Sequence, residues 1–150
     1  MFALNCVCLE LTLLAERVMI ASDAIPYDAN GKGHPRAAGS FCNVLGRYVR
    51  ERGIITLHEA IKKMTIMPAQ RLEQVAPVFK RKGRLQVGCD ADVVVFDPAT
   101  VIDRATFAEP MVASTGVKDL IVSGVPVVAG GVLTGARPGK ACKSAPEGGE

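Results

Sequence analysis

The 150-residue sequence is poor in the side chains from which a complete catalytic site is usually built. It has only two histidines, His34 and His58, and contains no H-x-H or H-E-x-x-H motif. A catalytic zinc site takes three protein ligands and a water, so these residues offer no obvious one. The sequence also lacks a G-x-S-x-G elbow, a P-loop and a dinucleotide-binding fingerprint.

Other absences narrow the class of protein. No apolar run reaches the roughly 20 residues that span a bilayer. The apolar start lacks a preceding Lys or Arg and is interrupted by Glu10, so we do not expect a signal peptide or a membrane partner. A formal charge of +3 is too small to indicate nucleic acid. The five cysteines form no C-x-x-C pair, which favours reduced thiols in a cytoplasmic protein.

What is present indicates a globular α/β chain, with 49% hydrophobic residues. We expect a buried strand at 18–20, a long loop at 24–39 and a helix capped by Ser40 and stopped at Gly53. Thr56 and Glu59 form a capping box for a second helix, and a third begins at Pro68. The basic stretch 80–84 is interpreted as a solvated loop. We then expect a strand at 92–97 that is buried on both faces, and a hairpin turning at 123–124.

Three residues are candidates for chemistry. Asp23 directly follows the predicted strand, so it is either a metal ligand or general base, or a turn-capping side chain. Arg36 is either a planar fork for a substrate carboxylate or plain surface. His34 is a candidate ligand, proton carrier or donor on the same loop. The other histidine, His58, lies off the apolar stripe of its helix, and we interpret it as exposed and structural.

Taken in order, these segments resemble the metal-dependent amidohydrolases, especially the N-acyl-D-amino-acid deacylases (D-aminoacylases). The similarity covers about residues 14–140. Many amidohydrolases share the G-x-L-x-x-G motif at 83–88 followed by A-D-V-V-V-F-D at 91–97. The deacylase branch is indicated by H-P-R at 34–36, by D-R-A-T-F at 103–107 and by T-G-A-R-P-G at 134–139.

The resemblance implies a fold, a set of roles and a reaction. Residues 18–82 would be the last strand and closing helices of a (β/α)₈ barrel, and 83–139 part of a small β-sandwich. An unmatched or helical N-terminus (1–17) and a flexible tail (140–150) would flank them. Asp23 would match the family's metal-site aspartate, which shuttles a proton, and Arg36, with His34 beside it, would grip the substrate carboxylate. The cofactor would be zinc and the reaction hydrolysis of the amide of a small N-acyl-D-amino acid.

The family's other metal ligands have no counterpart in the sequence, and a whole barrel takes about 250 residues. We therefore expect the chain alone to be inactive. One alternative is a non-catalytic remnant or β-rich module that needs a companion fragment carrying the rest of the barrel. Another is a different amidohydrolase branch, such as a dihydropyrimidinase-like hydrolase.

Overall fold

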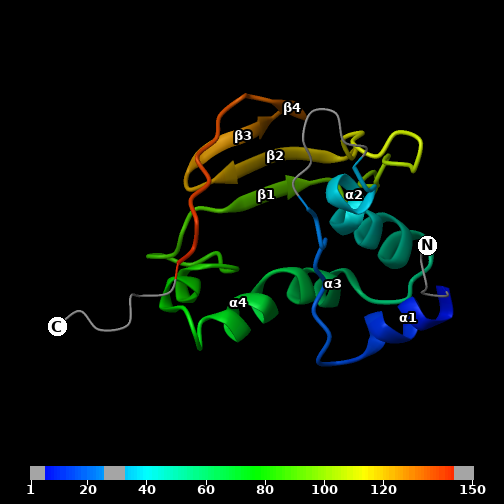
Figure 1. The fold of residues 1–150 in the computed structure, drawn as a ribbon, viewed down its shortest axis with the longest axis horizontal. Coiled ribbons are helices and arrows are strands. Elements are labelled where there is room, and N and C mark those ends of the chain that lie inside the picture. Colours follow the sequence, from blue (N-terminus) through cyan, green and yellow to red (C-terminus); the bar gives the residue numbers. More distant parts are fainter. Residues whose placement is uncertain (1–5, 26–32, 144–150) are drawn as a thin grey trace. The chain divides into compact units, whose positions relative to one another are not determined.

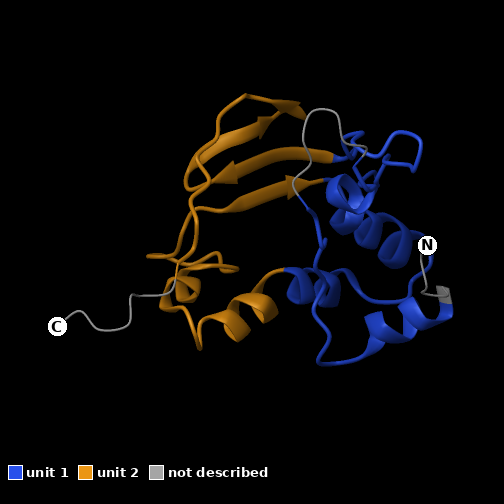
Figure 2. Cartoon of the chain, in the orientation of Figure 1, with its two compact units in different colours: residues 1–64, 97–116 blue, residues 65–96, 117–150 orange. Residues whose placement is uncertain are grey.

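The computed structural model describes residues 6–25 and 33–143. The chain forms two compact units, each built from two separate stretches of sequence (Figure 2). Unit 1 consists of Met1–Met64 and Asp97–Gly116, and unit 2 of Thr65–Phe96 and Val117–Glu150. None of the helices in the described ranges is both long enough and apolar enough to cross a membrane.

Unit 1 contains four helical segments: α1 (Cys6–Leu14), α2 (Arg36–Asn43), the π-helical η1 (Val44–Glu51) and α3 (Leu57–Met64). Helix α2 runs directly into η1, since the junction residues keep right-handed helical dihedrals. The prediction that Ser40 caps this helix is wrong. The helix already begins at Arg36, and the Ser40 hydroxyl lies inside it, donating to the Arg36 carbonyl at 2.8 Å. Pro35 explains the earlier start, because its fixed φ and missing N–H suit a helix N-terminus.

The predicted end of the helix at Gly53 and the predicted start of α3 agree with the structure. Gly53 has a φ of 60° and its N–H donates to the Val49 carbonyl, so the predicted glycine stop is confirmed. The Thr56 hydroxyl accepts a hydrogen bond from the Glu59 N–H at 3.1 Å, as expected for the capping box of α3. His58, on the same helix, is exposed as predicted.

The predicted strand at 18–20 does not form, and this expectation was wrong. These residues have no regular structure, although Ile20 donates its N–H to the Lys63 carbonyl at 3.1 Å. A strand needs a hydrogen-bonded neighbour along its length, and the described residues supply none here. Of the predicted loop at 24–39, positions 26–32 lie outside the described residues and the end is already helical.

The segment 97–116 completes the core of unit 1. Val101 is 1% exposed, and the Arg50 guanidinium donates to the carbonyls of Pro98 and Val101 at 3.2 and 2.5 Å. Gly116 has a φ of 82° and lies against the Val101 backbone, so a side chain there would collide with it. Other buried apolar residues among the described part of the unit include Leu13, Val44, Leu45, Tyr48, Ile55 and Ala60.

Unit 2 combines two short helices with an antiparallel sheet (Figure 1). The helices are α4 (Ile66–Leu72), which begins two residues before the predicted Pro68, and the 3₁₀ helix η2 (Pro77–Arg81). The sheet has the order β1-β2-β3-β4, from β1 (Val93–Phe96), β2 (Val117–Val122), β3 (Val125–Ala129) and β4 (Val132–Leu133). The predicted hairpin is confirmed: Ser123 and Gly124 both have positive φ, 50° and 79°, as a two-residue hairpin turn requires.

The expectation that β1 is buried on both faces is wrong. Val94 and Val95 are 49% and 44% exposed. Burial on both faces requires a covering layer over each face. Because consecutive residues of a strand point to opposite faces, the exposure of Val94 and of Val95 shows that solvent reaches both faces of β1. The run of valines therefore identifies the strand correctly but not its surroundings.

Candidate functional site

The structure brings together Asp23 and Arg36, two of the three candidate residues. Arg36 Nη2 lies 3.0 Å from Asp23 Oδ2, and Arg36 Nε donates to the Asp23 backbone carbonyl at 2.8 Å. Asp23 follows the segment 18–22, which has no regular structure, and has a φ of 50°, a conformation that Asp tolerates better than most residues. Its side chain is 81% exposed, whereas that of Arg36 is 30% exposed. The arginine is thus held in place and the carboxylate is open to solvent.

The His34 ring contacts the N-terminus of α2, the helix that begins at Arg36. Its Nδ1 accepts a hydrogen bond from the Arg36 backbone N–H at 3.0 Å. The ring meets Phe107 edge-on, with centroids 5.3 Å apart and planes at 87°. His34 therefore supports the start of the helix that carries Arg36.

A cavity of about 350 Å³ lies beside this site within unit 1. Arg36, Tyr48 and Asp103 are among its polar wall residues, while Asp23 and His34 are not among the described residues that line it. Most of the remaining lining is apolar and comes from α1, the segment 18–21 and the helix α2–η1. Arg36 is therefore the candidate that reaches both the Asp23 carboxylate and the cavity.

No group of three or more His, Cys, Asp or Glu side chains that could hold a metal ion occurs among residues 6–25 and 33–143. Asp23 is a single carboxylate paired with an arginine, and a catalytic zinc takes three protein ligands. The residues described therefore do not form a metal site by themselves.

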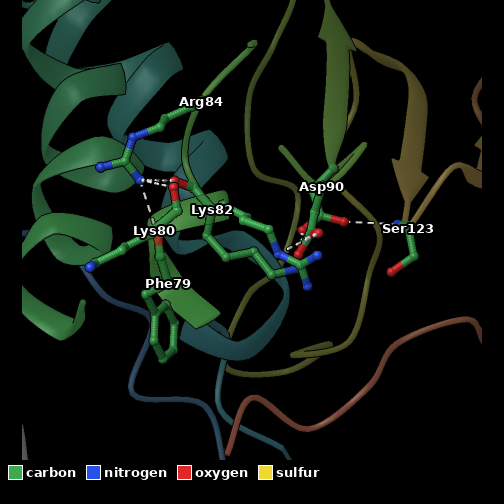
Figure 3. A network of polar contacts seen from close by, with 8 residues as sticks. Phe79, Lys80, Lys82, Arg84, Asp90 and Ser123 are labelled. Carbon is green, nitrogen blue, oxygen red and sulfur yellow. Dashed lines mark hydrogen bonds and ion pairs between the residues drawn. The ribbon is translucent and has the colours of Figure 1, made fainter. Parts of the chain in front are cut away.

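A polar network in unit 2 was not foreseen from the sequence (Figure 3). Lys82 Nζ contacts Asp92 Oδ2 at 2.5 Å and Asp90 Oδ2 at 3.0 Å, and Asp92 Oδ1 accepts from the Ser123 N–H at 2.8 Å. The hydrogen bond to Asp92 raises the pKa of Lys82 above its ordinary value. The bonds from Lys82 and from the Ser123 N–H lower the pKa of Asp92.

Arg84 extends this network to the preceding helix. Its Nη1 donates to the carbonyls of Phe79, Lys80 and Lys82 (Figure 3). Its Nη2 lies 2.7 Å from Glu73 Oε2. The interpretation of residues 80–84 as a solvated loop is therefore confirmed only for the exposure of Lys80 and Arg81, which themselves lie in η2. Half-buried Lys82 and Arg84 are instead engaged in ion pairs and carbonyl contacts. The sequence did contain a signal for these ion pairs, because Asp90 and Asp92 follow the basic stretch by only a few residues.

Residues 16–128 match the amidohydrolase family, and the chain belongs to that family. Its similarity extends to three curated relatives from Alcaligenes xylosoxydans xylosoxydans. It is 50% identical to an N-acyl-D-glutamate deacylase over 112 residues, covering 75% of the chain and 22% of the relative. It is 42% identical to a D-aminoacylase over 122 residues (81% and 24%) and 39% identical to an N-acyl-D-aspartate deacylase over 121 residues (81% and 23%).

Two solved structures of deacylases are also similar to the chain in fold. A D-aminoacylase studied for its binuclear metal center matches with a TM-score of 0.78 and 36% identity, over 89% of the chain and 27% of that protein. The N-acyl-D-glutamate deacylase from Bordetella bronchiseptica, solved with zinc and a phosphonate inhibitor, matches with a TM-score of 0.65 and 50% identity, over 73% and 22%. The chain has an amidohydrolase fold of helices and an antiparallel sheet, and it spans less than a quarter of the length of its curated relatives.

Proposed function

We propose that the chain is the C-terminal part of a zinc-dependent hydrolase that removes the acyl group from N-acyl-D-amino acids. The observation that carries this proposal is the similarity to three relatives whose names describe deacylation of D-amino acids. The products would be a carboxylate and a D-amino acid, formed in the cytoplasm.

For the architecture, we propose that residues 18–82 are the C-terminal part of a (β/α)₈ barrel, including its closing helices, and that 83–139 belong to a small β-sandwich. A segment at 1–17, which contains the helix α1, and a tail at 140–150 flank them. The helices α2, η1, α3 and α4 support the first assignment, since they fall within 18–82. The strands β1 to β4, all within 83–139, support the second.

For the site, we propose that Asp23 is the metal-site carboxylate, which also accepts a proton from the attacking water and returns it to the leaving amine. Arg36 binds the substrate carboxylate, and His34 supports the helix on which Arg36 lies. These roles are supported by the ion pair between the two residues, in which Arg36 Nη2 lies 3.0 Å from Asp23 Oδ2. The Arg36 guanidinium therefore already binds a carboxylate in the structure. The pair also leaves the Asp23 side chain 81% exposed, where a reactant has access to it.

The proposal includes a companion segment that carries the rest of the barrel. The described residues lack a group of three metal-binding side chains, and an isolated carboxylate does not hold a catalytic zinc. By itself the chain would be a non-catalytic module, and the remaining ligands would come from that companion.

A chimera tests the function. Residues 16–128 of this chain replace the matching part of the N-acyl-D-glutamate deacylase from Alcaligenes xylosoxydans xylosoxydans. We expect the purified chimera to bind zinc and to release D-amino acids from N-acetyl-D-glutamate, N-acetyl-D-aspartate or N-acetyl-D-leucine, with no release from the L-enantiomers. Asp23→Asn should lower kcat by at least about a hundredfold, as for loss of a general base, and Arg36→Met should raise KM more than it lowers kcat.

Two results would contradict the proposal. A chimera that folds and binds zinc but is inactive on all three substrates would overturn the assignment of the reaction. Zinc-dependent deacylation by the purified 150-residue chain alone would overturn the requirement for a companion segment.

A further inference from the structure

The cysteines of unit 2 share a cavity that the proposed reaction does not use. Cys89 and Cys142 are the only cysteines in the sequence of this unit, although they lie 53 positions apart in the chain. Both line a cavity of about 530 Å³ in unit 2, together with the turn residues Val122 and Ser123. Both are free thiols, with Cys89 half-buried and Cys142 exposed. Two thiols facing one cavity are the starting arrangement for a disulfide.

The wall of this cavity also carries charged side chains. Arg81, Lys82 and Lys140 line it against a single carboxylate, Asp90. That carboxylate is already paired, because Lys82 Nζ and Arg81 Nε lie 3.0 and 3.4 Å from its oxygens. The thiolate is the nucleophile in thiol oxidation and in disulfide formation.

The proposed bond requires the two cysteines to approach each other, and the Cys142 side lies outside regular structure. Disulfides need Cα atoms about 4.4–6.8 Å apart. Residues 139–143 have no regular secondary structure, so their backbone can shift without breaking a helix or a sheet ladder. Cys89 is the more constrained partner, since its N–H donates to the Gln86 carbonyl at 3.0 Å.

We propose that Cys89 and Cys142 form a reversible disulfide when the protein meets a peroxide. The Cys89 thiolate attacks one peroxide oxygen, forming an S–O bond and breaking the O–O bond, so that the other oxygen leaves as hydroxide. The Cys142 thiolate then attacks the sulfenic sulfur, forming the S–S bond and expelling a second hydroxide. Two thiols lose two electrons and their two protons, and one hydrogen peroxide becomes two waters.

The bond would close a loop that contains all four strands of the sheet, from β1 to β4. A cross-link over a long loop restricts the unfolded chain and so stabilises the folded one. The oxidised protein should therefore unfold at higher urea concentration than the reduced protein, and dithiothreitol should reverse the shift.

Peptide mapping tests the link directly. The reduced full chain is treated with equimolar hydrogen peroxide, alkylated and digested with trypsin, which releases Cys89 in peptide 85–104 and Cys142 in peptide 141–143. We expect these two peptides to be joined in the main cysteine product, and the thiol count of the denatured protein to fall from five to three. A main product that links Cys89 to Cys8 or Cys42, or an unlinked Cys89 sulfinic acid, would overturn the proposal.

Matched variants distinguish specific formation of the Cys89–Cys142 disulfide from non-specific oxidation of the thiols. Cys42→Ser should leave the link and the urea shift intact, because Cys42 belongs to unit 1. Cys142→Ser should abolish both and leave Cys89 as a sulfenic acid that dimedone captures. The same oxidation in concentrated urea should give a mixture of pairings; an equal share of the 89–142 link in urea and in buffer would count against the proposal.

Discussion

The two units differ in the sequence distance over which their stabilising polar contacts act. In unit 1, Lys63 binds the Leu13 carbonyl 50 residues away, Arg50 binds Val101 across 51 residues, and the Ser114 hydroxyl donates to Ala38 across 76. In unit 2, Lys82 and Asp92 are 10 residues apart, and Arg84 and Glu73 are 11 apart. The unit that carries the candidate site therefore depends on side-chain contacts with distant parts of the chain. In the sheet unit the side-chain ion pairs are local, and longer contacts such as the Ser123 N–H bond to Asp92, across 31 residues, lie at the sheet.

The largest expected effect is at Lys63, which tests the distant contacts of unit 1. Its side chain is 1% exposed, and its Nζ donates to the carbonyls of Leu13 and Ala15 at 2.7 and 2.5 Å, at the C-terminal end of α1. Lys63→Ala removes a buried stem and leaves both carbonyls without this donor. We expect a loss of about 3 kcal/mol of unfolding free energy, measured by urea denaturation, and faster amide exchange in α1.

Lys62→Ala is the matched control, one position away on the same helix. Its side chain is 45% exposed and its Nζ lies 3.5 Å from Glu59 Oε2. An exposed pair of this kind contributes about 0.3–0.5 kcal/mol. Similar losses for the two variants would contradict the view that the long-range contact of Lys63 stabilises unit 1.

The contrast between contacts of neighbouring residues and contacts of distant residues also explains which features the sequence could predict. The Thr56 hydroxyl bond of the capping box, the glycine stop at Gly53 and the hairpin turn at Ser123-Gly124 were confirmed, since each depends on residues within a few positions. The strand at 18–20 failed because a strand is defined by a partner elsewhere in the chain. The solvent exposure of β1 was missed for a similar reason, as covering layers leave no local pattern.

The candidate site and Lys63 show two reasons why the sequence predicted less than the structure shows: contacts between distant residues, and a pattern that was overlooked. Local pattern alone left Asp23 and Arg36 open between function and surface, and their ion pair spans 13 residues around a loop. Lys63 was missed although a signal existed. It follows the fully buried Ala60 by three positions, which places it on the buried face of α3 despite its charge.

An intermediate effect is expected in unit 2, where the pair of Lys82 and Asp92 tests the local contacts. Lys82→Met removes this pair and should cost about 0.5–1 kcal/mol near neutral pH, because both side chains are partly exposed to solvent. The pKa of Asp92 is lowered in the folded state, so its contribution is present above its ordinary pKa of about 3.9 and is lost as the pH falls through the folded value. The pKa of Lys82 is raised, so its contribution is present below about 10.4 and is lost as the pH rises through the folded value.

Urea denaturation of the native chain and of Lys82→Met across pH 2 to 11 checks this prediction. The stability difference should be a plateau that declines at both extremes. Lys80→Met, at an exposed position in η2, should show a much smaller difference with no such plateau. A difference between the native chain and Lys82→Met that does not vary with pH would indicate that lost packing of the lysine stem, and not the ion pair, causes the effect.

The smallest effect on stability is expected at Asp23, the residue with the largest proposed effect on activity. Its side chain is 81% exposed, and Asn tolerates its φ of 50° as well as Asp does, so Asp23→Asn should change the unfolding free energy by less than about 0.5 kcal/mol. Glu51→Gln is a fitting comparison, because Glu51 is 52% exposed and lies 3.5 Å from Arg50 in an ion pair of unit 1. Both variants should unfold near the native urea midpoint, while only Asp23→Asn should inactivate the chimera. If Asp23→Asn instead destabilised the chain as strongly as Lys63→Ala, the contact with Arg36 would be one more of the long-range contacts that stabilise unit 1. In that case any loss of activity would follow from unfolding, and the proposed catalytic role of Asp23 would lose its support.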